Sequence, residues 1–155
     1  MKRIVRLALG SALLVLLTLD TNLIGAERGT PVEAKAMLLK ALAHYKEVGR
    51  AQALADFTAK RPPFGDHDLY VVCFDRERSV VANGGFADYV GTRGDIPVDL
   101  NGKGVATVAW EVSSAGALGV VRYHWVNPSS RRLEIKTLFV ARTGNDVCGV
   151  GAFSQ

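Results

Sequence analysis

Apolar residues recur every three or four positions over residues 34–48, which predicts one long amphipathic helix. Thr30 stands before this stretch as an N-cap, and Glu33 three residues later completes a capping box. Gly49 is a typical helix stop, and residues 51–57 predict a short second helix after it. We expect the apolar stripe of the long helix to pack against the core of the protein.

The remainder of the chain alternates β-rich runs with turn residues. Val, Ile, Phe and Tyr are frequent in these runs, and Gly, Asn, Asp or Pro bound them. The predicted strands cover residues 68–75, 79–82, 120–126, 133–142 and 146–153. A Gly- and Asp-rich loop leads to residues 105–112, which predict a helix. Because the order lacks a βαβ rhythm, we expect a mostly antiparallel sheet and an α+β fold.

The start of the chain has the pattern of an export signal. A basic beginning is followed by an apolar run over residues 7–19, and small residues precede Glu27. The apolar run is too short to span a bilayer comfortably. We therefore predict a signal peptide over residues 1–26. The alternative is an uncleaved membrane anchor over residues 4–19.

Residues 27–155 have the length of one domain, which in either case lies in the periplasm or outside the cell. The whole sequence has a formal net charge of +4 at pH 7. Removing residues 1–26, with three basic residues and one acidic residue, leaves about +2. The basic character thus belongs largely to the export signal, and the composition gives no indication of nucleic-acid binding.

No grouping of residues in the sequence indicates catalysis or a bound cofactor. His44, His67 and His124 are too widely spaced for a metal-ligand motif. Cys73 and Cys148 form neither a CxxC pair nor a cluster with histidine. The serines lack a nucleophile elbow, and the glycines lack P-loop spacing. We therefore expect neither an enzyme nor a cofactor, although dispersed residues can still assemble a catalytic site.

The most specific pattern is a predicted hairpin with two aromatic residues, a proline turn and one lysine. It runs Tyr123-x-Trp125-x-Asn127-Pro128 and continues through a basic turn to Lys136. This hairpin resembles the signature of the single Cache family of the second type, PAS-like modules that sense ligands outside the cytoplasm. Further matches over the whole predicted domain are the helix opening at Thr30-Pro31, the Asp68-Leu69-Tyr70 segment, the Asn101-Gly102-Lys103 turn and the final Gly149-Val150-Gly151 strand.

The resemblance implies a five-stranded, PAS-like antiparallel sheet with the long N-terminal helix behind it. A small pocket is expected on the other face, capped by the middle loop and helix. Family ligands are small organic acids, amino acids or related metabolites, and the family is not enzymatic. We therefore expect an extracytoplasmic small-molecule sensor that acts through a membrane signalling partner. The alternative is a non-sensing scaffold or accessory subunit of an envelope complex; the oligomeric state stays open.

In a Cache-like sheet the first and last strands are neighbours, and each of these predicted strands carries one cysteine. A Cys73–Cys148 disulfide is then possible if both side chains share a face of the sheet. The alternative is two buried free thiols that pack as small hydrophobic groups. The strand register decides between them, and the sequence leaves it open.

A pocket for a small anion needs few polar groups on an apolar wall. In the ligand-binding site we expect Lys136 to supply a positive charge, Tyr123 a hydrogen bond, and Trp125 an apolar wall with an N–H group. Tyr70 and Phe74 share a face of the first long strand and either floor the pocket or pack in the core.

Alternatives stay open for several of these residues. Trp110, on the predicted middle helix, is either a lid residue or a core residue. Tyr123 and Trp125 share a strand face, and whether Lys136 joins them depends on the hairpin register. If it does not, the aromatics are core residues and the lysine is solvated. Phe139 stands where the family commonly has a tyrosine, which removes a hydroxyl that can touch ligand.

Overall fold

The computed structural model of the chain describes residues 28–113 and 117–154, and the predicted signal peptide lies outside them. Helix α1 spans Pro31–Val48 and begins with the predicted capping box. The Glu33 amide donates to the Thr30 hydroxyl at 3.2 Å, and the Thr30 amide donates to the Glu33 carboxylate at 2.8 Å. Gly49, with φ +81°, ends α1 and precedes α2 at Arg50–Thr58.

The sheet has six antiparallel strands in the order β1-β2-β6-β5-β4, with β3 also paired to β2. The predicted α+β class and antiparallel pairing are confirmed. The sequence predicted five strands and missed β1, which is only two residues long and carries no periodic signal. The strands are β1 Gly65–Asp66, β2 Leu69–Phe74, β3 Val80–Asn83, β4 Gly119–Val126, β5 Leu133–Thr143 and β6 Asp146–Phe153.

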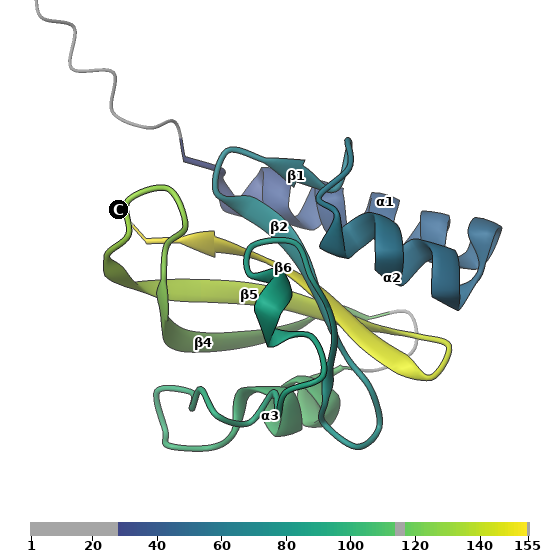
Figure 1. Cartoon of the computed structure of the whole chain (residues 1–155). Coiled ribbons are helices and arrows are strands. Elements are labelled where there is room, and N and C mark those ends of the chain that lie inside the picture. The colour runs from purple at the N-terminus through teal and green to yellow at the C-terminus, as the bar shows by residue number, and fades with distance from the viewer. Residues whose placement is uncertain (1–27, 114–116, 155) are drawn as a thin grey trace, which may run out of the picture.

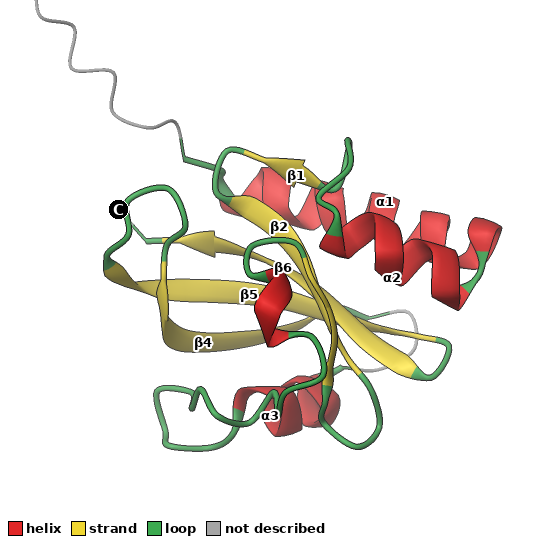
Figure 2. Cartoon of the chain, in the orientation of Figure 1, coloured by secondary structure: helices red, strands yellow, loops and turns green. Residues whose placement is uncertain are grey.

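The two faces of the sheet are covered by different parts of the chain (Figures 1 and 2). Helices α1 and α2 lie on one face, where Leu38 and Phe57 pack against Val71 and Val150. The short helix α3, Val105–Val112, lies on the other face together with loop 86–104. Among the described residues, no helix is long and apolar enough to cross a membrane.

A disulfide joins two strands of the sheet, and a buried ion pair ties the helical layer to the sheet. Cys73 of β2 and Cys148 of β6 stand directly opposite each other and are joined by a disulfide. At the turn between β5 and β6, the fully buried Asp146 accepts hydrogen bonds from Arg50 at 2.9 and 3.1 Å and from the Tyr45 hydroxyl at 2.7 Å. Burial, and after it the hydrogen bond to Asp146, raises the pKa of Tyr45 to about 12.

Candidate ligand-binding site

A small cavity lies between the α3 side of the sheet and loop 86–104. The space within it is about 30 Å³, enough for about two water-sized groups. Strands β2 and β4, loop 86–104 and the start of α3 all contribute to it. Its lining consists of Tyr70, Val72, Phe74, Val80, Asn83, Tyr89, Arg93, Gly94, Pro97, Val105, Tyr123 and Trp125.

Strand alternation places the lining side chains. Tyr70, Val72 and Phe74 are every second residue of β2, and Tyr123 and Trp125 are every second residue of β4. Between these strands, the residues of β6 on this face include Gly149 and Gly151, which have no side chains to fill the space above the sheet.

Loop 86–104 is fastened over the cavity by side-chain and backbone contacts. The Asp95 carboxylate accepts hydrogen bonds from the Thr107 amide at 2.8 Å and the Thr107 hydroxyl at 2.9 Å. The Leu100 amide donates to the Arg122 carbonyl at 3.0 Å, which fixes the end of the loop to the edge of β4. These contacts hold the loop over the cavity, which stays partly open to solvent.

Aromatic rings from the loop and the sheet meet at one end of the cavity. Phe86 and Tyr89 lie edge-on to Trp125, with ring centroids 5.8 and 5.5 Å apart. Phe86 also contacts Tyr70, at 6.2 Å, and Tyr123 contacts Trp125 at 6.1 Å. Such edge-to-face contacts give this wall a defined shape rather than a loose apolar surface.

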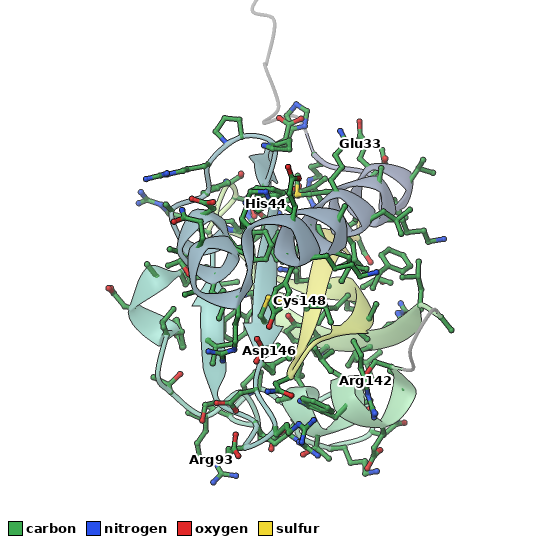
Figure 3. All side chains as sticks on the ribbon, turned by 90° about the vertical axis from the view of Figure 1, so that its right-hand side faces the viewer. Glu33, His44, Arg93, Arg142, Asp146 and Cys148 are labelled. Atoms are coloured by element: carbon green, nitrogen blue, oxygen red, sulfur yellow. A yellow bond between two sulfur atoms is a disulfide. The ribbon has the colours of Figure 1, made fainter. Side chains whose placement is uncertain are left out.

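The polar groups of the lining are three tyrosine hydroxyls, an asparagine, an indole N–H and one arginine. Burial raises the pKa of Tyr70 and of Tyr123, so both hydroxyls are neutral hydrogen-bond donors near neutral pH. The Arg93 side chain is 76% exposed and lies 4.0 Å from Asp95. It stands at the end of the molecule remote from α1, pointing outward (Figure 3). Arg93 thus brings a permanent positive charge to the edge of the cavity.

Lys136 lies next to the cavity but outside its lining. Its side chain is fully buried, and its Nζ atom lies 3.6 Å from the centroid of the Tyr70 ring and 4.9 Å from that of Phe153. The Nζ atom makes no hydrogen bond within the described part of the chain. Burial lowers the pKa of Lys136 well below its ordinary value, and the charge of Asp68 only partly opposes this.

The structure brings together four of the six residues that the sequence proposed for ligand binding. Tyr70, Phe74, Tyr123 and Trp125 all line the cavity. The hairpin register pairs Lys136 with Tyr123, which places both on the cavity face of the sheet and leaves the lysine buried rather than solvated.

Trp110 lies away from the cavity, so its expected place as a lid residue is not adopted in this conformation. Its indole N–H donates to the Asp75 carbonyl at 2.7 Å, and its ring lies between the guanidinium groups of Arg78 and Arg142. The reason is helical geometry. Val105 lines the cavity, and five further residues turn a side chain by about 140° around the helix.

Phe139 also lies away from the cavity. It packs in the cluster beneath α1, where the Lys35 ammonium stands 4.8 Å from its ring. The substitution of phenylalanine for tyrosine at this position therefore removes no group from the cavity.

Eight lining residues were missing from the sequence-based site, and the polar ones among them are Asn83, Tyr89 and Arg93. Tyr89 and Arg93 belong to an irregular loop, in which no periodicity indicates the direction of a side chain. The bridge between Ser79 and Arg93 places that part of the loop beside β3. Only the three-dimensional course of the loop reveals these residues as part of the cavity.

No protein-family model matches the sequence, and no curated protein matches it significantly. Solved structures do resemble it. A methyl-accepting chemotaxis protein from Vibrio parahaemolyticus RIMD 2210633 has a TM-score of 0.64 at 18% identity, over 79% of this chain and 86% of that chain. A periplasmic sensor domain of a chemotaxis protein has a TM-score of 0.58 at 22% identity, over 78% and 88%.

A third neighbour is a Cache chemosensory domain described for its recognition of carboxylic acids, with a TM-score of 0.53 at 16% identity, over 78% of this chain and 86% of that chain. The fold is that of a Cache-type sensor domain. At these identities the similarity concerns the fold alone. In this Cache-type fold, the cavity lies on the α3 side of the sheet, as the resemblance of the sequence implied.

Proposed function

We propose that this protein is an extracytoplasmic sensor domain that binds a small carboxylate under loop 86–104 and acts through a membrane signalling partner. The observation that carries the proposal is the cavity: a partly open, mostly apolar space with a few polar groups in its lining, the usual form of a small-molecule site. Support also comes from the periplasmic and carboxylic-acid-recognising domains that share the fold. The export pattern at the start of the chain supports the location.

The chemistry of the lining favours an anion with a short apolar tail. Arg93 supplies a positive charge at the edge of the cavity, and the neutral hydroxyls of Tyr70 and Tyr123 are available as donors. Val72 and Phe74 form an apolar floor that excludes a second charged group. Because the space of about 30 Å³ holds only about two water-sized groups, even a two-carbon acid requires loop 86–104 to open or its side chains to move.

The competing function is a scaffold or accessory subunit that binds no small molecule. The observation in its favour is the same small volume, because the aromatic side chains already fill most of the space beneath the loop. On this alternative, the rings of Phe86, Tyr89 and Trp125 are simply a core cluster. A direct binding measurement separates the two functions.

The test is thermal unfolding of the purified protein with acetate, propionate, lactate, pyruvate and a set of amino acids. A ligand at a hundred times its dissociation constant stabilises the folded state by about 2.7 kcal/mol, which raises Tm by several degrees. We expect one or more short monocarboxylates to produce this rise. A flat response to every compound, with no small molecule released on denaturation, would favour the scaffold.

Two arginine variants make the test specific for the cavity. Arg93→Gln removes the charge at the cavity, and we expect affinity for a stabilising carboxylate to fall about 10- to 100-fold. Arg132→Gln removes an exposed arginine from the turn between β4 and β5 and serves as the matched control. Equal loss in both variants would indicate a general charge effect instead of a site under the loop.

A further inference from the structure

The burial of Lys136 has a specific local cause. Its strand partner is Tyr123, so its side chain starts on the cavity face of the sheet. Its stem then lies across Gly151 of β6, where any Cβ atom would collide with the lysine methylenes. The amine ends between the rings of Tyr70 and Phe153. The lysine therefore rests in a seat formed by a glycine and two aromatic rings.

No carboxylate of the described residues makes a hydrogen bond or a direct ion pair with the amine. The two charged groups that act on it are Asp68 and Lys60, and Lys60 repels it. Asp68 is already engaged: one oxygen accepts from the Gly29 amide at 2.8 Å and the other from the Asn127 side chain at 2.9 Å.

The titratable neighbours on the sheet do not supply a charge either. Tyr70 from β2 and Tyr123 from β4 have raised pKa values and are neutral near neutral pH, and Phe153 from β6 does not titrate. An ammonium group held here is therefore desolvated without an ion-pair partner, which is costly. The neutral amine is the form that suits this seat.

We propose that Lys136 meets the ligand as a neutral amine and becomes protonated on binding, so that the domain takes up one proton with each carboxylate. The inference rests on the proposed function. The amine lies 3.6 Å from the centroid of the Tyr70 ring, which lines the cavity, and Tyr123, the direct strand partner of Lys136, lines it as well. Rotation about the four-carbon stem brings Nζ to the carboxylate. The proton comes from solvent, an N–H bond forms, and the ammonium and carboxylate make an ion pair.

The proposal gives a definite pH dependence. Between the lowered pKa of Lys136 in the free protein and its higher pKa in the complex, each bound carboxylate requires a proton. In that interval the dissociation constant for the anion rises up to tenfold per pH unit as pH increases. Below the interval the lysine is protonated in both states, and the dependence vanishes. Arg93 holds its charge throughout and contributes no such dependence.

The test is isothermal titration of the purified protein with acetate, propionate, lactate and pyruvate in buffers of different ionisation enthalpy, from about pH 6 to about pH 9. Proton uptake appears as a buffer-dependent heat. We expect the uptake to approach one proton per carboxylate within this range. Lys136→Met should reduce affinity at least tenfold and abolish the uptake, whereas Arg93→Gln should reduce affinity and keep it.

The NMR chemical shift of the lysine 13Cε atom reports directly whether the amine is protonated. This measurement remains informative if Lys136→Met binds too weakly to titrate. The resonance that disappears in Lys136→Met belongs to Lys136, and in the wild-type protein it should shift on addition of ligand as an amine becomes an ammonium group. Binding without buffer-dependent heat at every pH, uptake that persists in Lys136→Met, or an unshifted resonance would overturn the inference while leaving the proposed function intact. No binding of any compound would remove the proposed function, and this inference with it.

Discussion

Two buried charged residues in this domain have opposite surroundings. Asp146 is fully buried, but two nitrogens of Arg50 and the Tyr45 hydroxyl meet its oxygens. Lys136 is equally buried and has only ring faces around its nitrogen. Cation–π attraction stabilises an ammonium group at a desolvated site by about 2 kcal/mol or somewhat more. This is less than the hydration free energy that the ammonium group loses there. At the residue scale, Lys136 is therefore a group held in place at a cost to stability.

We predict that Lys136→Met stabilises the folded protein, because methionine fills the same seat without a polar nitrogen. The unfolded lysine keeps its proton up to its ordinary pKa near 10.5, whereas the folded one loses it at lower pH. The advantage of the variant should therefore grow by about 1.4 kcal/mol per pH unit as pH falls from about 10.5, then level off below the folded-state pKa. Urea unfolding across this pH range measures it.

The matched control for this prediction is Lys40→Met, an exposed lysine on α1. It should change the free energy of unfolding by no more than about 0.5 kcal/mol. A Lys136→Met variant that is less stable than the wild-type protein, or whose effect is independent of pH, would mean that the folded domain holds Lys136 charged.

At the scale of elements, the sequence was sufficient wherever a periodic pattern or a cap determined the structure. The capping box at Thr30, the stop at Gly49 and the final strand Asp146–Phe153 follow the prediction closely. The face of Lys136 was not predictable, because a one-residue change of register moves a strand side chain to the other face. Arg93 was missed for a different reason, since it lies in a loop fastened by distant residues such as Thr107.

The contact between α2 and the turn after β5 gives a second prediction. Arg50→Gln leaves the fully buried Asp146 with the Tyr45 hydroxyl but without a cation. Because Arg50 itself is 48% exposed, we expect a loss of about 2–4 kcal/mol in the free energy of unfolding, at the lower end of the range for a fully buried pair. Arg76→Gln, on the neighbouring β2–β3 turn, is the exposed control. Equal stability of both variants would show that solvent compensates Asp146.

At the scale of the whole molecule, the two ends of the described chain meet at Arg28 and Ser154. Arg28 donates to Glu134 at 2.7 Å and to the Ser154 carbonyl at 3.1 Å. Gly29 next to it donates to Asp68, the residue whose charge acts on Lys136. The ion pair with Arg28 lowers the pKa of Glu134 to about 2. Residues 28 and 29, at the start of the described chain, are thus linked through Asp68 to Lys136, which we propose to change charge on binding.

The disulfide is a covalent link between two strands that are far apart in the sequence. It joins β2 to β6 across a separation of 75 residues and lies under α1, in the middle of the sheet. In the chain-entropy view, a cross-link that closes a long loop restricts the unfolded state strongly, and bridges of this kind contribute about 2–5 kcal/mol. The bridge therefore limits how far the two halves of the sheet can separate.

We predict that a reductant lowers the urea midpoint of the wild-type protein by the equivalent of about 2–5 kcal/mol. The Cys73→Ala/Cys148→Ala double variant should start from a lower midpoint and show no response to reductant, because it has no bridge to lose. The slope against urea should rise on reduction, since an uncrosslinked chain exposes more surface when it unfolds. A wild-type midpoint that ignores reductant at equilibrium would mean that the two cysteines are free thiols packed side by side, and that hydrogen bonds and packing alone hold β2 against β6.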